Sequence, residues 1–189
     1  MKNELYSDLL EKDFEYSGKL IIPESKKLLR SFLSIISHSC DSWYWLIGLF
    51  LLWALGDAVW KERAVLWAVG LVILAAFVLL IKFLVRRPRP EGEWGQIYRD
   101  TDPHSFPSGH AARAALIAVL IVKLTGGWLA IVVIMWAILV GWSRIALKLH
   151  YLSDVLIGWL IGVVSGLLAS QYYPWFSQQL EFILKLFPR

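Results

Sequence analysis

The sequence predicts an all-α fold: a polytopic membrane helix bundle with about five spanning helices and an interfacial amphipathic helix at each terminus. The first reason is composition, because 58% of the 189 residues are hydrophobic, 18% are charged and the mean hydropathy is +0.57. A soluble domain of this size could not bury so much apolar surface, so a bilayer must act as part of its solvent. The other reasons are five long apolar runs and several Trp residues near the run ends, where indoles favour the membrane interface.

The terminal segments are mixed in charge and flank the apolar runs. Residues 1–41 form the interfacial N-terminal segment, in which residues 28–36 have helical apolar spacing and Arg30 with the serines provides a polar side. This pattern is typical of a helix that lies on the membrane. Residues 174–189 repeat the amphipathic character. Because we find no internal repeat and no linker, we expect a single domain over residues 1–189.

Each apolar run approaches or exceeds the ~20 residues that a helix needs to cross a bilayer, although the third is short and carries Arg113. Only the loop over residues 86–107 is long, and it holds four of the seven prolines. Irregular backbone cannot lie exposed in lipid, so we expect this loop to cover an aqueous site at the membrane surface. The runs are residues 42–60, 64–85, 108–124, 128–147 and 151–172.

Three polar clusters lie at run ends, and the order of the helices places all of them on one side of the membrane. Cations inside or beside a bilayer are costly, so several of them at helix ends indicate a function. Three cations, a Ser-Gly turn that opens a helix and two histidines supply the charge, backbone donors and proton carriers that suit a phosphate group. The clusters are Lys82 with Arg89, then Ser108 with Gly109 and His110, then Arg144 with His150 and Asp154.

His150 and Asp154 are four residues apart, so both side chains share one helix face. A carboxylate that accepts from one imidazole nitrogen leaves the other free to attack phosphorus, as expected of a nucleophilic histidine. A surface His-Asp pair is the alternative, but the position at the head of an apolar helix favours the catalytic interpretation. The same face continues through Gly158, Gly162 and Gly166, a stripe that predicts tight helix packing and turns Asp154 toward the bundle.

His110 begins the third run behind Ser108 and Gly109. Ser108 can cap that helix, and the free backbone amides of the turn would face an anion. A phosphate held there would lie beside His110, which could protonate the departing oxygen as general acid; a cap with an incidental histidine is the alternative. Arg113 shares this helix face and could reach the second phosphate of a diphosphate, unless it pairs with a buried carboxylate or snorkels outward.

Lys82, Arg89 and Arg144 form a predicted charge clamp for the phosphoryl oxygens. Arginine offers planar forked donors and lysine a point charge, which together can hold three equatorial oxygens during transfer. Snorkelling to the head groups is the alternative for any cation at a helix end. We favour snorkelling for Arg86, Arg87 and Lys148.

Composition also limits the cofactors and partners. One cysteine, Cys40, and four histidines give no zinc pattern, so we expect neither a metal nor another cofactor. The net charge of +4 is not arranged as a basic stripe with interleaved aromatics, which argues against nucleic acid. The expected partners are a phosphorylated lipid and the membrane. Outside the three clamp cations, ten Lys and Arg residues lie on the catalytic side against five on the other, which predicts a cytoplasmic active site.

The segments KFLVRRPRP, FPSGHAARAAL and GWSRIALKLHYLSD resemble the three signature motifs of the type 2 phosphatidic acid phosphatase superfamily, which also includes vanadium haloperoxidases. The resemblance covers residues 82–166 and fills every signature position. It implies a metal-independent lipid phosphatase in which His150 forms a phosphohistidine, Asp154 is its partner and His110 is the general acid. The phosphate binders that it implies are Lys82, Arg89, Ser108, Gly109 and Arg144.

Within this superfamily, the chain looks more like the polyisoprenoid diphosphate phosphatase branch than like broad phosphatidylglycerophosphate phosphatases. The resemblance therefore implies a lipid phosphomonoester or diphosphate as substrate, of isoprenoid or phosphatidate type. Family members usually have six spanning helices, whereas this sequence predicts five. A vanadate-dependent haloperoxidase would use the same anion pocket but gains nothing from five crossings. A non-catalytic lipid-binding or transport protein would be expected to lack one of the site residues His110, His150 or Asp154.

Overall fold

The computed structural model describes residues 2–91 and 102–186, with side chains for residues 7–91 and 102–179. This part of the chain forms seven helices and no strand, which confirms the all-α prediction. The middle of the predicted long loop, residues 92–101, lies outside the described residues. The helices are α1 (Lys2–Lys19), α2 (Lys27–His38), α3 (Ser42–Leu55), α4 (Ala58–Val85), α6 (Gly109–Thr125), α7 (Gly127–Ala146) and α8 (Leu152–Leu186).

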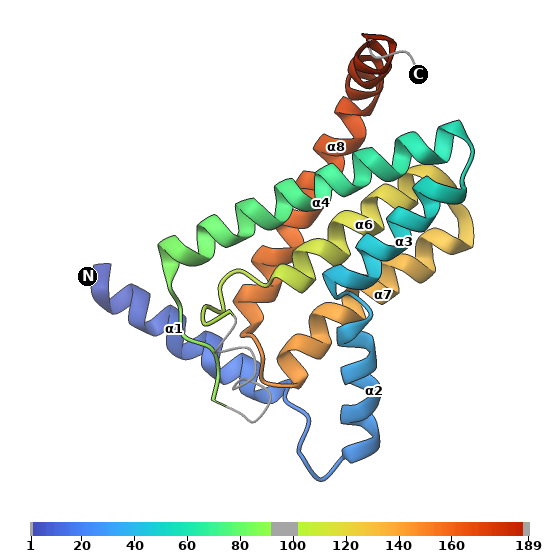
Figure 1. Cartoon of the computed structure of the whole chain (residues 1–189). Coiled ribbons are helices and arrows are strands. Elements are labelled where there is room, and N and C mark those ends of the chain that lie inside the picture. The colour runs from blue at the N-terminus through green and yellow to red at the C-terminus, as the bar shows by residue number, and fades with distance from the viewer. Residues whose placement is uncertain (1, 92–101, 187–189) are drawn as a thin grey trace.

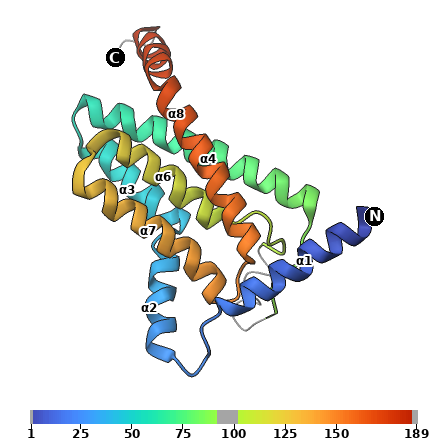
Figure 2. The same cartoon turned by 180° about the vertical axis from the view of Figure 1, so that it is seen from behind.

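Helix α6 is the centre of the bundle and packs most extensively against α8 and α7. Helix α4 contacts both α6 and α8, with α3 beside it, while α2 packs on α7. Figures 1 and 2 show α1 and α2 at the end of the bundle where α8 begins, with the last turns of α8 projecting from the opposite end. The ends of α4 and α7 and the starts of α6 and α8 therefore meet at the end of the bundle that α1 and α2 flank.

Three helices are long and apolar enough to cross a membrane. Helix α6 has 17 residues and carries Arg113 and Lys123, and it can be short and partly polar because the surrounding helices, not lipid, cover most of its surface. Helix α3 is apolar but shorter than the other candidates. Three of the five predicted runs thus contain helices that qualify on length and composition: Ala58–Val85, Gly127–Ala146 and Leu152–Gln179.

Two predicted boundaries are wrong. The run over residues 42–60 is interrupted, because α3 ends at Leu55 and α4 begins at Ala58. Asp57 caps α4 by accepting from the backbone N–H of Trp60 at 3.0 Å, a position that a short carboxylate prefers over a helix interior. At the other terminus, no separate amphipathic helix begins at Pro174. Helix α8 continues through this proline and bends, since Figure 1 shows its last turns end on.

Helix α2 is amphipathic as predicted, but its polar side faces the protein. Arg30 is buried and donates to the backbone oxygen of Ile22 at 2.9 Å, and Ser37 is fully buried. The opposite side exposes Leu28 and Phe32, with exposed fractions of 90% and 52%. The apolar side of α2 is therefore free to contact lipid, while its polar side contributes to the end of the bundle where the site lies.

The predicted glycine stripe on α8 is confirmed as the contact between α8 and α6. A Cβ added at Gly162 would lie 2.1 Å from the backbone oxygen of Ala112, and one at Gly158 would lie 2.6 Å from that of Ser108. At Gly166 the nearest atom would be the Cβ of Val119, at 2.7 Å. Only glycine allows the two backbones to approach this closely. The start of α8 is consequently held against the start of α6.

Candidate active site

A polar cavity of about 230 Å³ lies at the end of the bundle where α4 and α7 end and α6 and α8 begin. All the residues predicted for the site line this cavity except Ser108 and Asp154, which are fully buried beside it. The helix order thus brings three short segments of sequence together, as expected. The predicted residues that line the cavity are Lys82, Arg89, Gly109, His110, Arg113, Arg144 and His150.

His150 lies in the turn before α8 and is only 2% exposed. Its Nε2 is 3.2 Å from Nη1 of Arg89, and its Nδ1 is 3.6 Å from Oδ2 of Asp154. The second distance is too long for a hydrogen bond, so the predicted His-Asp pair is adjacent but not bonded. Burial lowers the pKa of His150 well below its usual 6.5, and the charges of Arg89, Arg144 and Lys82 lower it further. The imidazole is therefore neutral at neutral pH.

The carboxylate of Asp154 is held by other donors. Its Oδ1 accepts from Arg87 at 2.9 Å, and its Oδ2 accepts from the backbone N–H of Tyr151 at 2.9 Å. The backbone oxygen of Asp154 accepts from the N–H of Ser108 at 2.9 Å, which ties the start of α8 to the start of α6. These contacts fix the carboxylate beside Nδ1 of His150 without using the imidazole as a donor.

The expectation that Arg87 snorkels to the head groups is wrong. Its side chain is only 11% exposed and donates to Asp13 at 2.7 Å, to Ser153 at 2.7 Å and to Asp154. The guanidinium also stacks 4.1 Å from the ring centroid of Tyr151. Two carboxylates and an aromatic ring give Arg87 strong charge-assisted partners inside the protein, so its side chain turns inward and holds Asp154.

Helix α1 supplies the cap of α8. Oδ1 of Asp13 accepts from the backbone N–H of Ser153 at 3.0 Å, and Oγ of Ser17 accepts from that of Leu152 at 2.8 Å. Asp13 and Ser17 are four residues apart, so they share one face of α1. The first amides of α8 are thus satisfied by a helix that lies about 140 residues earlier in the chain.

Ser108 caps α6 as predicted. Its Oγ accepts from the backbone N–H of Ala111 at 3.5 Å, a long bond, and its side chain is fully buried. Gly109 follows as the first residue of the helix and lines the cavity. The start of α6 therefore borders the cavity, where the partial positive charge of a helix N-terminus favours an anion.

Two clamp cations converge on one carboxylate oxygen. Lys82 donates to Oδ2 of Asp102 at 2.7 Å, and Arg89 donates to the same oxygen at 2.8 Å. Lys82 also donates to the backbone oxygen of His104, and Arg89 to that of Leu149. Both cations are nearly fully buried, whereas the Asp102 side chain is 35% exposed. The carboxylate of Asp102 thus occupies a position between the cations where an anionic oxygen of a ligand would bind.

The other two cations of the cavity contact the last turn of α2 and the segment that joins α2 to α3. Arg144 is 1% exposed and donates to Oγ of Ser37 at 2.5 Å. Arg113 donates to the backbone oxygen of Cys40. Neither predicted alternative for Arg113, a buried carboxylate or the head groups, describes this contact, because its partner is a backbone carbonyl. Arg113 nevertheless remains part of the cavity wall.

His110 has a carboxylate partner that the sequence did not indicate. Its Nε2 lies 2.7 Å from Oδ1 of Asp41, and Oδ2 of the same carboxylate lies 2.8 Å from Nδ1 of His38. Burial alone would raise the pKa of Asp41, but the two imidazoles hold it at about 2. Asp41 is therefore an anion beside the predicted general acid.

Sequence reasoning missed Asp13, Asp41, Asp102 and the inward orientation of Arg87. Asp41 immediately precedes an apolar run, a position that usually marks an ordinary helix cap. Asp102 lies in the loop that was expected to cover the site, which is a weak signal for a contact there. Asp13 gives no signal, because nothing in a charged amphipathic helix distinguishes one carboxylate from its neighbours.

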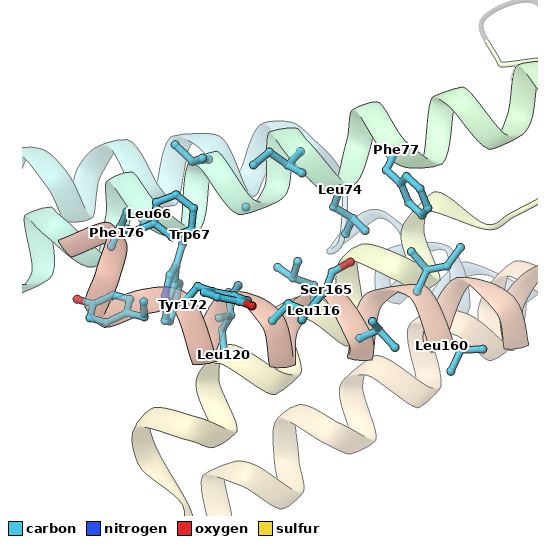
Figure 3. A pocket seen from close by; sticks show the side chains of 18 residues that line it. Leu66, Trp67, Leu74, Phe77, Leu116, Leu120, Leu160, Ser165, Tyr172 and Phe176 are labelled. Atoms are coloured by element: carbon cyan, nitrogen blue, oxygen red, sulfur yellow. The ribbon is translucent and has the colours of Figure 1, made fainter. Parts of the chain in front are cut away.

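A second cavity, of about 590 Å³, is apolar and lies among α4, α6 and α8. Figure 3 shows Leu74 and Phe77 projecting from α4 toward α8, with Ser165 of α8 and Leu116 of α6 on the facing side. Leu74 also lines the polar cavity, so this side chain separates the two spaces. We call this second cavity the apolar groove. Together, the apolar groove and the cationic cavity match the two halves of an amphiphilic phosphate ester.

Comparison with known proteins agrees with this geometry. A family model described as PAP2 superfamily matches residues 63–178. A decaprenylphosphoryl-5-phosphoribose phosphatase of Mycobacterium tuberculosis is 37% identical over 124 residues, which cover 64% of this chain and 68% of that protein. An undecaprenyl-diphosphatase of Sulfolobus acidocaldarius is 31% identical over 113 residues, which cover 54% of each chain.

A solved structure has the same fold. The transmembrane PAP2 type phosphatidylglycerolphosphate phosphatase from Bacillus subtilis superimposes with a TM-score of 0.72 over 87% of this chain and 86% of that chain. The two sequences are 23% identical, so this likeness concerns the arrangement of the helices. The architecture that positions the polar cavity is therefore shared with a membrane phosphatase.

Proposed function

Because the chain belongs to the PAP2 superfamily of membrane lipid phosphatases, we propose that it hydrolyses an isoprenoid phosphate or diphosphate through a phosphohistidine formed on His150. The observation that carries the proposal is the geometry of His150, whose Nε2 faces Arg89 at 3.2 Å in a cavity lined by four cations. A guanidinium donates and cannot accept, so Nε2 carries a lone pair. That lone pair is the nucleophile.

The proposed reaction has two steps. In the first, Nε2 of His150 bonds to phosphorus while the bond to the leaving oxygen breaks, and His110 transfers a proton to that oxygen. Lys82, Arg89 and Arg144, with the amides at the start of α6, hold the phosphoryl oxygens as negative charge spreads over them. In the second step, His110 takes a proton from water, which attacks phosphorus and releases phosphate and free His150.

The isoprenoid part of the proposal rests on the relatives and on the apolar groove. Two relatives are named for decaprenylphosphoryl and undecaprenyl substrates. The groove beside Leu74 offers an apolar wall for a long chain whose phosphate lies in the polar cavity. We assign the second phosphate of a diphosphate to Arg113, which borders the cavity one turn beyond His110.

A substrate panel with purified protein tests this proposal. Phosphate release would be measured in EDTA from an undecaprenyl diphosphate, the matching monophosphate, phosphatidate and phosphatidylglycerophosphate, with His150→Ala as the blank. Faster turnover of the isoprenoid pair, retained in EDTA, is expected, because the four cations that line the cavity can neutralise the charge of the phosphate. A preference for the glycerolipids, or activity that requires an added divalent ion, would contradict the proposal.

The assignment of Arg113 has its own comparison. Arg113→Gln should lower kcat/KM on the diphosphate by ~1.5–3 kcal/mol more than on the monophosphate, the value of one charge-assisted hydrogen bond. Equal losses on the two substrates would instead assign Arg113 to holding Cys40 and the α2–α3 segment.

We also propose that the active site faces the cytoplasm, on the basis of the Lys and Arg count. Single cysteines at Glu24 and Lys123, in a protein whose Cys40 is replaced by serine, would report the topology, because both positions are exposed and lie at opposite ends of the bundle. An impermeant thiol reagent applied to intact cells should label the cysteine at 123 and not the one at 24. The reverse pattern would place the site on the outer face.

A further inference from the structure

Asp41 stands immediately before α3, where an aspartate ordinarily caps the helix. Its side chain makes no capping hydrogen bond to α3. Instead, Oδ1 lies 2.7 Å from Nε2 of His110, and Oδ2 lies 2.8 Å from Nδ1 of His38. The carboxylate thus contacts two imidazoles and does not cap α3. A helix cap usually contributes about 1 kcal/mol of stability, so its absence here indicates that Asp41 has another role.

The contact defines which nitrogen of His110 can act on a ligand. Because Nε2 contacts Asp41, only Nδ1 of the ring is left to interact with a ligand in the cavity that His110 lines. For Nδ1 to donate a proton while Nε2–H donates to Asp41, the imidazole must be positively charged. A neighbouring carboxylate favours this charged form.

The surroundings explain why a carboxylate is needed there. Burial opposes protonation of the His110 imidazole, and so do the positive charges of Arg144 and Arg113, which line the same cavity. His38 faces the far oxygen of Asp41, and Lys82, Arg89 and His150 border the rest of the cavity. Among the described residues, Asp41 is the carboxylate in hydrogen-bond contact with His110. Its pKa is about 2, so it is ionised at neutral pH.

We propose that Asp41 is a positioning residue that favours the protonated form of His110 and aims Nδ1–H at the leaving-group oxygen. The proposal rests on the proposed phosphatase function. As the bond from phosphorus to the leaving oxygen breaks and that from phosphorus to Nε2 of His150 forms, the proton on Nδ1 moves to the oxygen. His110 becomes neutral and keeps its Nε2–H on Asp41, ready to accept a proton from the water of the second step. No other reactant is required.

The test compares leaving groups that differ in their need for a proton. An isoprenoid monophosphate expels a strongly basic alkoxide, whereas 4-nitrophenyl phosphate expels a weakly basic phenolate that needs no general acid. Asp41→Asn keeps the size of the side chain and a hydrogen-bond acceptor but removes the charge. We expect kcat to fall about 10- to 1,000-fold on the isoprenoid monophosphate and less than about threefold on 4-nitrophenyl phosphate.

Two further variants separate positioning from general damage. In a His110→Ala background, which lacks the acid, adding Asp41→Asn should cause no further loss on either substrate. His38→Asn, which removes the other partner of Asp41, should change both rates by less than about threefold. The thermal midpoint and the affinity for vanadate would show that each variant folds and retains its anion site.

The outcomes distinguish this proposal from the proposed function. An Asp41→Asn variant that loses the same factor in kcat on both substrates would overturn the role of Asp41 and leave the phosphatase assignment intact. So would a double variant whose kcat falls below that of His110→Ala alone. A wild-type protein that hydrolyses neither substrate would overturn the proposed function itself.

Discussion

Nε2 of His150 lies 3.2 Å from Nη1 of Arg89, and this contact sets the tautomer of the histidine. Because a guanidinium only donates, Nε2 must be unprotonated, and the proton of the neutral ring is on Nδ1, 3.6 Å from Oδ2 of Asp154. The side chain is thus held, before any substrate binds, in the one form that can attack phosphorus through Nε2.

His150→Ala should abolish turnover. The physical reason is that His110, the other imidazole that lines the cavity, has its Nε2 on Asp41 and is assigned to protonating the leaving group. His110→Ala should slow formation of the intermediate by about 100- to 10,000-fold, and Asp154→Asn should have an intermediate effect. Acid-labile labelling from a ³²P substrate, with His104→Gln as the histidine control, would measure the intermediate. A labelled His150→Ala protein would refute the nucleophile.

Activity should persist below the usual titration range of histidine. Burial and three cations lower the pKa of His150 well below 6.5, so the nucleophile stays neutral as the pH falls through 6.5. The same shift has a stability consequence, because the unfolded chain binds a proton near pH 6.5 that the folded chain does not. Stability is therefore fully present above that pH and declines as the pH falls below it. Histidine NMR, assigned with His150→Gln, would measure the titration; a midpoint at or above 6.5 would contradict the prediction.

Asp13→Ala should strongly destabilise the protein. It leaves Arg87 without one of two carboxylates in a pair whose side chains are 11% and 10% exposed, a loss that typically costs ~3–5 kcal/mol. Asp8→Ala on the same helix is the matched control, because its pair with Lys12 is more than half exposed and its loss should leave the stability almost unchanged. Thermal unfolding in detergent would compare them. Similar midpoints for the two variants would show that α1 does not support the site.

Asp102→Asn should increase the affinity for anions. The carboxylate occupies the space between Lys82 and Arg89, so a phosphate must displace it or bear its repulsion. Removing the charge should lower the Kd for vanadate by roughly 3- to 10-fold, about the net value of one ordinary hydrogen bond. Binding would be followed by inhibition at several pH values, with Asp8→Asn as control. Weaker binding in Asp102→Asn would instead assign the carboxylate to ordering the two cations.

Gly162→Ala should destabilise the contact between α6 and α8. The new Cβ would lie 2.1 Å from the backbone oxygen of Ala112, and overpacking of this kind costs ~1–3 kcal/mol or more. Gly70→Ala on α4 is the control, since a Cβ there meets no atom within 4 Å and alanine should stabilise the helix slightly. Unfolding midpoints that move in the same direction would contradict the tight-packing interpretation.

The sequence predicted most polar residues of the cavity, because they fall in three short segments at the ends of apolar runs. Helix topology alone then brings His110 and His150 to one end of the bundle. The supporting carboxylates could not be predicted in this way, since Asp41 meets His110 across 69 residues and Asp13 meets Arg87 across 74. No periodicity connects such positions, and each carboxylate has an ordinary local explanation.

The apolar helices of the fold could be predicted from hydropathy. Features that depend on single polar residues were not predicted. Gly56 and Asp57 inside the first run are a stop and a start signal, and they divide the run into α3 and α4. The side on which α2 is buried could not be seen either. Its polar face packs inward because Ser37 and Arg30 find partners in the protein, whereas amphipathicity alone predicts only that two different faces exist.

The caps that Asp13 and Ser17 place on α8 have a consequence for biosynthesis. Helix α1 precedes α8 in the chain, so the ribosome must synthesise the start of α8 before these two helices can meet. His150 and Asp154, which lie at that junction, cannot be fixed in position until then. We therefore expect the proposed site to form late in biosynthesis, after α1 has docked on the start of α8.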